Sequence, residues 1–204
     1  MKLTLIALAM AAAGLIATPT VSHAANGDNG GFFINGNVGQ SNVDKGIYND
    51  NDNGYGLNFG YRWAMSPGAA IGIEGGYTDL GKFAVDNSAA GFGLPGAKIE
   101  GWTAGVNGHF NVTPNWYLSG RAGLFRADVK GVSGPYVTAS DGSVTALSFI
   151  PVDGTSNKYY AGVGFGYDFS NNASVGLNYD YYKANTNGLQ LSPDLVSVSA
   201  EYRF

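Results

Sequence analysis

Apolar and polar residues alternate along most of the chain. In the last ten residues, every second position is apolar and the positions between are polar or charged, the apolar ones being Val196, Val198, Ala200, Tyr202 and Phe204. Successive side chains of a β-strand point to opposite faces, so this pattern predicts a strand with one apolar face. Eight segments show it, near 31–41, 54–64, 69–79, 98–111, 116–128, 157–169, 173–184 and 195–204. Each is about as long as a tilted strand that crosses a bilayer.

The connections between these segments alternate in length. Tight turns are predicted at 65–68, 112–115 and 170–172, and longer polar or glycine-rich loops at 42–53, 80–97, 129–156 and 185–194. Outer-membrane barrels have short periplasmic turns and longer external loops. The sequence therefore predicts an all-β fold, an eight-stranded antiparallel up-and-down transmembrane β-barrel with both chain ends in the periplasm.

A water-soluble β-sandwich would also have short alternating strands, and the placement of aromatic residues separates the two folds. On the apolar face, one set lies beside the short turns or the C-terminus: Trp63, Phe110, Trp116, Phe169 and Phe204. A second set lies near the long loops: Tyr55, Tyr77, Trp102, Tyr159 and Tyr181. Two aromatic girdles around an aliphatic band match the two membrane interfaces, whereas a sandwich core has no reason to sort aromatics by height.

Residues 1–24 have the features of a cleaved secretory signal peptide. Lys2 precedes an apolar run from Leu3 to Ala17, and Ser22-His23-Ala24 supplies the small–x–small pattern that signal peptidase accepts. The run is too short for a membrane-spanning helix, which needs about 20 residues. We expect cleavage after Ala24, which would leave an outer-membrane β-barrel domain of residues 25–204.

Composition favours a membrane barrel over a soluble domain. Charged residues make up 13% of the chain, against about 25% in soluble domains. Cysteine is absent, which excludes disulfides and thiolate metal sites. Without Lys2, 10 basic residues face 15 acidic ones, a net charge of −5. This negative charge excludes nucleic acid as a partner.

Eight strands enclose a lumen that is just wide enough for side chains to fill. The polar face carries seven charged residues that we expect to form an ion-pair plug: Arg62, Glu74, Arg121, Asp168, Asp180, Glu201 and Arg203. Unpaired charges are costly in such a space. Distance from the turns predicts that Glu74 and Arg121 lie near mid-height, and that Arg62, Asp168, Glu201 and Arg203 lie lower.

The segments Gly60-Tyr61-Arg62-Trp63 and 73–82 resemble the second and third strands of the OmpA-like transmembrane barrel family. The ending 198–204 resembles the terminal signal of such barrels, which implies that Tyr202 and Phe204 are recognised by the barrel assembly machinery. The resemblance also implies internal Glu–Arg pairing with Glu74, Arg121 and Arg203. The resemblance is to the short OmpX-type and opacity-type members, which have no peptidoglycan-binding domain. The loops of these members often serve adhesion or host contact.

Catalysis is not expected. The lipid A palmitoyltransferase and deacylase barrels resemble this chain in size, but need a histidine beside a serine and an acid at the outer leaflet. After signal removal His109 is the only histidine, and its parity and position place it in the lumen near the periplasmic end. We therefore predict no catalytic residues and a hydrogen-bonded lumen role for His109.

Two motifs imitate ligand sites. Residues 49–54 (NDNDNG) resemble the start of a calcium loop but lack a glutamate at the twelfth position. They are interpreted as a solvated loop, with weak calcium binding left open. Gly162-x-Gly164-x-Gly166 imitates a nucleotide fingerprint, but no helix follows it. No metal and no cofactor is expected.

The leading hypothesis is a non-enzymatic, monomeric protein of the cell outer membrane with a structural and surface role. Its expected partners are outer-membrane lipid, lipopolysaccharide, the assembly machinery and a host or matrix ligand bound by the external loops. The loop 129–156 is either a flexible connection or a surface-contact site. The alternative is a small-solute or ion pore gated by the lumen salt bridges, and a third hypothesis is lipid A modification.

Overall fold

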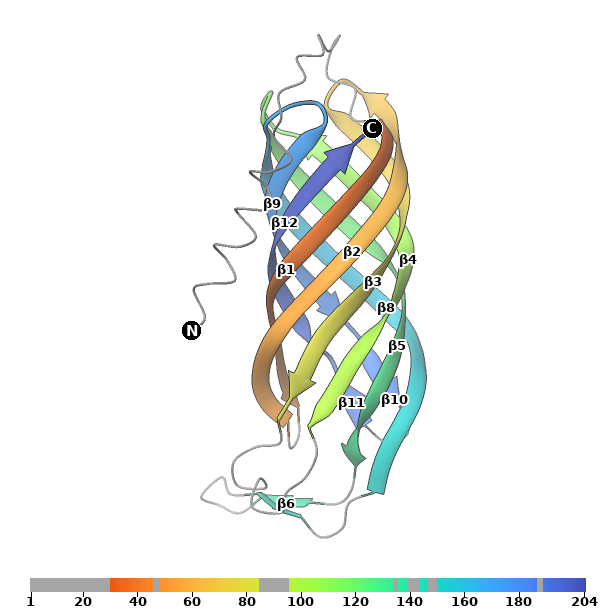
Figure 1. Ribbon diagram of the computed structural model, residues 1–204, viewed down its shortest axis with the longest axis vertical. Helices are drawn as coiled ribbons and strands as arrows, with labels where there is room; N and C mark the ends of the chain where they lie inside the picture. The colour runs from red at the N-terminus through yellow and green to blue at the C-terminus, as the bar shows by residue number, and fades with distance from the viewer. Residues whose placement is uncertain are drawn as a thin grey trace.

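Eight long strands close into a barrel in which each strand pairs antiparallel with both neighbours (Figure 1). The computed structural model describes residues 30–45, 48–84, 96–133, 136–138, 144–146, 150–186 and 189–204. The predicted signal peptide and its cleavage point lie outside these residues. The barrel strands are β1 (Gly31–Lys45), β2 (Tyr48–Ser66), β3 (Ala69–Phe83), β4 (Ala97–Asn111), β5 (Trp116–Ser133), β8 (Ile150–Asp168), β9 (Ala173–Tyr182) and β12 (Asp194–Arg203).

The barrel is closed by pairing between its first and last strands. The register of β1 and β12 runs from Phe33 opposite Arg203 to Asn42 opposite Asp194. A closed ring leaves no strand edge with unpaired backbone groups. The predicted eight-stranded antiparallel barrel is confirmed. Among the described residues there is no helix long and apolar enough to cross a membrane.

The three short turns lie together at one end, close to the C-terminus (Figure 1). Gly68 has a φ of +81°, which suits glycine, and its carbonyl accepts a hydrogen bond from the Asn111 amide at 2.7 Å. The Asp168 amide donates to the Asn115 carbonyl at 2.7 Å. These bonds join neighbouring turns into one rim.

Strands extend farther toward the loop end than the sequence predicted. β2 already begins at Tyr48, β5 runs to Ser133 and β8 begins at Ile150. Much of the predicted loops 42–53 and 129–156 is therefore strand, as are the two ends of the predicted loop 80–97, and those boundaries were wrong. Two short antiparallel pairs complete the described structure: β6 (Tyr136–Thr138) with β7 (Val144–Ala146), and β10 (Ala184–Thr186) with β11 (Leu189–Leu191). Apart from Ala184, the second pair lies within the predicted loop 185–194.

The strands extend farther because several of them exchange their apolar and polar faces toward the loops, as β5 shows. In β5, Leu118 and Leu124 are exposed on the outer wall and Arg121 faces inward. Farther toward the loops, Arg126 is exposed and Phe125 is fully buried. An outer wall in lipid must be apolar, whereas one in water can be charged and needs an apolar interior. We therefore expect the strands to leave the membrane where this change occurs.

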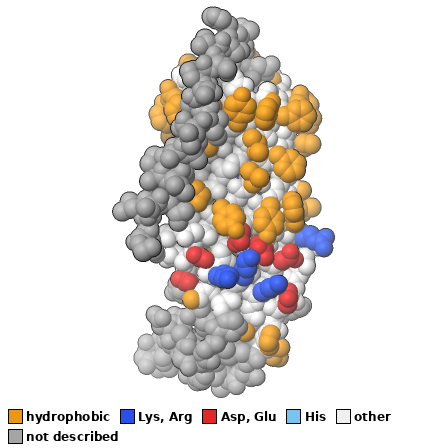
Figure 2. All heavy atoms as spheres, in the orientation of Figure 1, with side chains coloured by type: hydrophobic (Ala, Val, Ile, Leu, Met, Phe, Trp, Pro, Cys, Tyr) orange, Lys and Arg blue, Asp and Glu red, His pale blue; other side chains and the backbone are white. Residues whose placement is uncertain are grey.

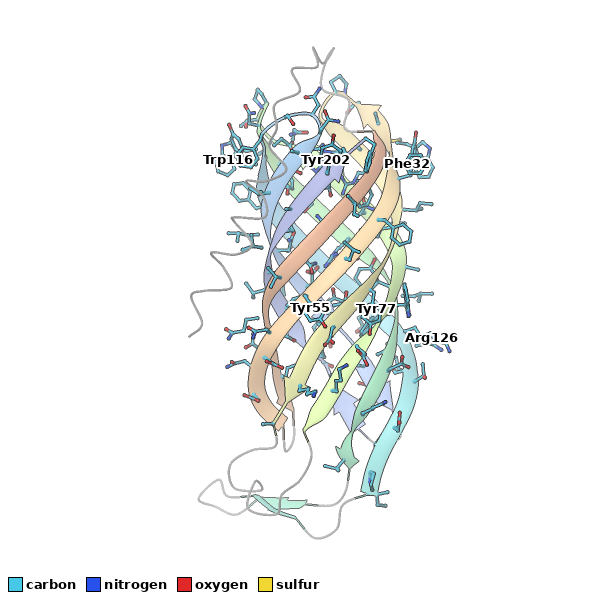
Figure 3. All side chains as sticks on the ribbon, in the orientation of Figure 1. Phe32, Tyr55, Tyr77, Trp116, Arg126 and Tyr202 are labelled. Atoms are coloured by element: carbon cyan, nitrogen blue, oxygen red, sulfur yellow. The ribbon has the colours of Figure 1, made fainter. Side chains whose placement is uncertain are left out.

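The surface shows the same division. Apolar side chains cover the wall toward the turn end, and charged side chains gather in a belt on its loop side (Figure 2). Phe32, Trp116 and Tyr202 lie near the turn end, whereas Tyr55 and Tyr77 lie nearer the loops (Figure 3). All ten predicted girdle residues are exposed or half-exposed: Trp63, Phe110, Trp116, Phe169, Phe204, Tyr55, Tyr77, Trp102, Tyr159 and Tyr181. Their role at the two membrane interfaces stays a prediction.

We expect the folded protein to need detergent and to migrate differently on a gel before and after boiling. The closed ring of backbone hydrogen bonds resists detergent unfolding at room temperature, whereas the exposed apolar wall requires a lipid-like solvent. Electrophoresis of unheated and boiled samples tests both points. A monodisperse protein in detergent-free buffer would contradict a membrane barrel.

Candidate functional site

The lumen near the turn end holds four buried charges in one network. Arg62 and Glu201 form a bidentate pair, with Nη1–Oε1 at 2.6 Å and Nη2–Oε2 at 2.9 Å. Arg203 Nη2 lies 2.6 Å from Asp168 Oδ1, and its Nε lies 3.6 Å from Glu201 Oε1. Two cations therefore alternate with two carboxylates, an arrangement in which each buried charge has an opposite neighbour.

His109 extends this network rather than forming a separate site. Its Nε2 lies 3.0 Å from Asp168 Oδ2, and Asn111 Nδ2 donates to the same oxygen at 2.6 Å. The imidazole stacks on Tyr117 with 4.1 Å between ring centroids. His109 is 1% exposed, and it belongs to the turn end of β4, where the sequence predicted it.

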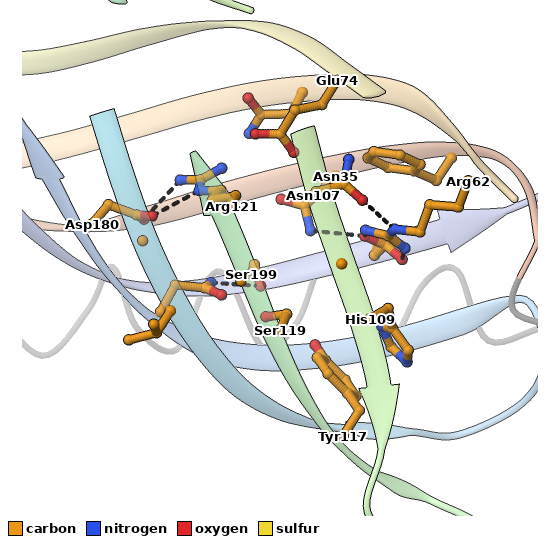
Figure 4. A pocket seen from close by; sticks show the side chains of 18 residues that line it. Asn35, Arg62, Glu74, Asn107, His109, Tyr117, Ser119, Arg121, Asp180 and Ser199 are labelled. Atoms are coloured by element: carbon orange, nitrogen blue, oxygen red, sulfur yellow. Dashed lines mark hydrogen bonds and ion pairs between the residues drawn. The ribbon is translucent and has the colours of Figure 1, made fainter. Parts of the chain in front are cut away.

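A second layer of charges lies nearer mid-height (Figure 4). Arg121 Nε and Nη2 each donate to Asp180, at 2.7 Å. Glu74 Oε1 accepts a hydrogen bond from the Tyr160 hydroxyl at 2.6 Å. The resemblance implied Glu–Arg pairing for Glu74 and Arg121, but here the carboxylate bound to Arg121 is Asp180. The structure thus separates the seven predicted plug residues into two layers.

A small cavity of about 40 Å³ lies between the two layers (Figure 4). Arg62, Asn107, Arg121 and Asp180 are among its lining residues. The buried Nδ2 atoms of Asn58 and Asn107 have no hydrogen-bond partner among the described residues. Buried amides of this kind are commonly satisfied by ordered water, and a space of this size holds about three water molecules. The cavity is too small for a typical organic ligand.

The lumen on the loop side of these charges is closed by an apolar seal, which the sequence analysis missed. It comprises fourteen residues, each 3% exposed or less: Val43, Leu80, Phe83, Ala97, Ile99, Phe125, Ala127, Val129, Val132, Tyr160, Tyr182, Ala184, Leu191 and Leu195. Ala184 and Leu191 come from the β10–β11 hairpin, which therefore contributes to the closure. Alternating apolar residues at 125, 127 and 129 carried the signal, but the predicted strand ended at 128 and the predicted loop began at 129.

The lumen therefore has two kinds of barrier in series. Ion pairs fill the part surrounded by the apolar outer wall, and the seal fills the part beyond it. A dry apolar constriction excludes water and ions without any charge. Breaking the ion pairs would accordingly leave the loop-side closure in place.

Another charged cluster lies outside the barrel, on the loop side of Trp102. Lys98 Nζ is 2.6 Å from Glu100 Oε2 and 3.6 Å from Asp79 Oδ2. The hydroxyl of Tyr77 donates to Glu100 at 2.8 Å, and that of Tyr55 donates to Asp79 at 3.1 Å. Hydrogen bonds from Lys98 and then Tyr77 lower the pKa of Glu100. Two predicted girdle tyrosines, Tyr55 and Tyr77, thus donate hydrogen bonds to the two carboxylates that pair with Lys98.

Residues 49–54 belong to β2, so their interpretation as a solvated loop was wrong. Asp50 Oδ2 accepts the Ala84 amide at 2.9 Å, and Asp52 Oδ2 accepts the Lys82 amide at 2.8 Å. These carboxylates fasten β2 to the end of β3. In the described part of the chain, no three His, Cys, Asp or Glu side chains are grouped so as to hold a metal ion.

Tyr202 and Phe204 lie at the turn end of the closing strand. The Phe204 amide donates to the Phe32 carbonyl at 2.9 Å, and the Tyr202 and Phe204 rings are 5.1 Å apart. The Phe204 side chain is 75% exposed. Such exposure leaves this ring accessible at the turn end of the barrel. Recognition by the assembly machinery stays a prediction.

The Arg121–Asp180 pair is expected to be important for stability. Replacing Arg121 by alanine leaves the Asp180 carboxylate, 0% exposed, without its cation. Removing one partner of a buried pair costs about 3–5 kcal/mol. We expect a loss of that size in the free energy of unfolding, measured by denaturant titration in micelles.

Arg126→Ala is the matched control, since it makes the same substitution on the outer wall of the same strand. It should change the unfolding midpoint far less. The Arg121→Ala/Asp180→Ala variant should recover part of the loss, because no carboxylate is then stranded. Equal effects of Arg121→Ala and Arg126→Ala would show that the buried pair adds no stability.

Comparisons with known proteins agree with this architecture. Residues 7–204 match the family model described as outer membrane protein beta-barrel domain. The attachment invasion locus protein Ail of Yersinia pestis is 15% identical, with a TM-score of 0.51 over 85% of this chain and 99% of Ail. A second Ail structure, in complex with the heparin analogue sucrose octasulfate, is 14% identical, with a TM-score of 0.50 over the same shares.

Neisserial surface protein A is 10% identical, with a TM-score of 0.51 over 85% of this chain and 97% of that protein. These identities show a common fold and no more. No curated protein sequence matches the chain. The family match covers nearly the whole sequence and agrees with the closed eight-stranded ring. The chain therefore belongs to the outer-membrane β-barrel family, whose members reside in the cell outer membrane.

Proposed function

We propose that the protein is a non-enzymatic surface protein whose closed barrel holds its loops away from the membrane for contact with a host or matrix ligand. The observation that carries this proposal is the exchange of faces along the strands. A barrel that only spanned the bilayer would not need strands that continue beyond it and there have a charged outer wall around an apolar core.

The extension is largest on β5 and β8. From the pair Arg126–Asn157, beyond the apolar wall, pairing continues to Ser133–Ile150, a total of eight residue pairs. At about 3.3 Å per residue, this is roughly 25 Å of strand. The strand ends at Ser133 and Ile150 are thereby held well above the lipid surface, where a large partner can approach.

The interior supports a binding role over catalysis or transport. His109 lies at the turn end, away from the loops, and is bound to Asp168. The seal closes the loop side of the lumen with side chains that are apolar apart from two tyrosine hydroxyls, and those hydroxyls are already hydrogen-bonded to Glu74 and Arg121. Both features support loops as the working surface.

Replacing residues 134–149 by Asn-Gly should abolish ligand binding while the barrel still folds. The last registered pair is Ser133–Ile150, so a two-residue hairpin turn can join the strands without changing their register. Binding of labelled barrel to host cells, matrix proteins and heparin, a polyanion of the kind seen bound to Ail, is the measurement. Unheated gel migration reports the fold.

The matched control replaces residues 84–96 by the same turn, because Phe83 and Ala97 are also a registered pair. It should bind as the wild type does if 134–149 carries the contact. Full binding by the variant without 134–149, or by a barrel lacking both segments, would contradict the proposed loop role.

The closed lumen makes a separate prediction for single-channel recordings in planar bilayers. Wild type should not conduct, and neither should Glu74→Ala/Arg121→Ala, because the seal remains. Conductance should appear only when Phe125→Ser and Leu195→Ser are combined with that variant and with Arg62→Ala/Glu201→Ala, because the network of Arg62, Glu201, Arg203 and Asp168 otherwise still fills the turn end. Steady conductance of the wild type would favour the pore hypothesis, and conductance of Glu74→Ala/Arg121→Ala alone would show that ion pairs form the only barrier.

A further inference from the structure

The three short turns enclose a hollow at the end of the barrel opposite the loops (Figure 1). Its volume is about 520 Å³, and residues of all three turns line it. Sites for small ligands usually have volumes of about 300–1,000 Å³, whereas the lumen cavity of about 40 Å³ is far smaller. We call this hollow the turn cup, and its lining includes Pro67, Thr113, Pro114, Asn115 and Asn171.

Hydrogen bonds between the turns fix the shape of the turn cup. The Asn111 amide donates to the Gly68 carbonyl at 2.7 Å, which joins the first turn to the end of β4. The Asp168 amide donates to the Asn115 carbonyl at 2.7 Å, and Asn115 Nδ2 donates to the Asp168 carbonyl at 3.0 Å. A ligand therefore meets a site that is already ordered, which lowers the entropic cost of binding.

The turn cup offers no free charge to a ligand. Asp168 is the one charged residue among those that line it, and it is 6% exposed. Its Oδ1 is bound to Arg203, and its Oδ2 to His109 and Asn111. An ionised ligand would find no opposite charge to pair with, so the lining favours an uncharged one.

The lining can nevertheless form hydrogen bonds. Asn171 is exposed and has no hydrogen-bond partner among the described residues. The Thr113 hydroxyl accepts the Trp116 amide at 3.0 Å and can still donate its own proton. Amides and hydroxyls both donate and accept, as the hydroxyl groups of a sugar do. The rings of Pro67 and Pro114 add apolar surface beside these groups.

Two other classes of uncharged ligand fit the turn cup less well. An apolar molecule would leave its amides and hydroxyls without partners, which costs binding energy. An extended peptide usually binds through its main chain to the edge of a sheet. The barrel strands form a closed ring, so the wall around the turn cup has no such edge.

We propose that the turn cup binds a neutral oligosaccharide, with Asn171 and Thr113 hydrogen-bonded to sugar hydroxyls and the two proline rings against the apolar face of a sugar ring. Short turns of outer-membrane barrels face the periplasm. The glycan would there be either an N-acetylated amino-sugar chain or a neutral glucan. The inference goes beyond the proposed loop function and does not depend on it.

The test is an NMR titration of the full barrel, in a detergent without a sugar headgroup, with an N-acetylglucosamine trimer and with a glucose trimer. The amide signals of Gly68 and Asn115 should shift saturably with at least one trimer, and the signal of Gly154 on the loop side should not. Asn171→Ala should weaken binding about fivefold, the usual effect of losing one hydrogen bond. Asn157→Ala is the matched control on the exposed loop side of β8 and should bind as the wild type does.

The trimer that binds more tightly identifies the kind of glycan, and either result supports the proposal. No saturable shift with either trimer, equal losses in Asn171→Ala and Asn157→Ala, or equally tight binding of a galacturonic acid trimer would each overturn it. A neutral tripeptide amide that binds as tightly would overturn the assignment to a glycan. Unheated gel migration confirms that the variants fold. The variant without 134–149 keeps the turn cup and should bind the sugar normally, so this proposal and the loop proposal fail separately.

Discussion

Every backbone amide and carbonyl inside the hydrocarbon layer must find its partner within the protein, because no water is available there. Closure of β1 on β12 meets this requirement in a ring of only eight strands. The small ring leaves a narrow lumen, which its own side chains must fill. Glycines at inward positions make the space: a Cβ on Gly162 would overlap Asp180 Oδ1. The Arg121–Asp180 pair therefore depends on glycine at that position.

The two barriers in the lumen have one cause. Apolar and polar residues alternate along each strand, and the surroundings of the wall change from lipid to water. Where lipid surrounds the wall, apolar residues are placed outside and the charges are left to pair inside. Where water surrounds it, Arg126 is outside and Phe125 is inside, without any change in the parity of the strand. The seal is thus the ordinary hydrophobic core of the barrel section beyond the membrane. The ion pairs fill the section within it.

The sequence predicted the number of strands, their order and the three turns, because alternation and turn residues are local properties. It did not predict the true ends of β2, β5 and β8, because their polar outer faces there resemble loop composition. Arg121 and Asp180 could be placed in the lumen from the sequence, because alternate residues of a strand face the same side. Their pairing depends in addition on the stagger, the shift of one strand relative to the next along the barrel. They lie on β5 and β9, separated by β8 in the ring. That stagger is a property of the closed barrel and cannot be deduced from one strand.

Charges on the outer wall are subject to a different constraint from those in the lumen. A lumen charge must be paired within the chain, since nothing else can reach it. A wall charge at headgroup level can leave its pairing to the surrounding lipid, so an unneutralised cation there costs little. Lys98, with two carboxylates in reach, is paired as a lumen charge would be. Among the described residues, Arg126 and Lys183 have no carboxylate within 4.0 Å, so the outer wall tolerates an unpaired cation that the lumen could not.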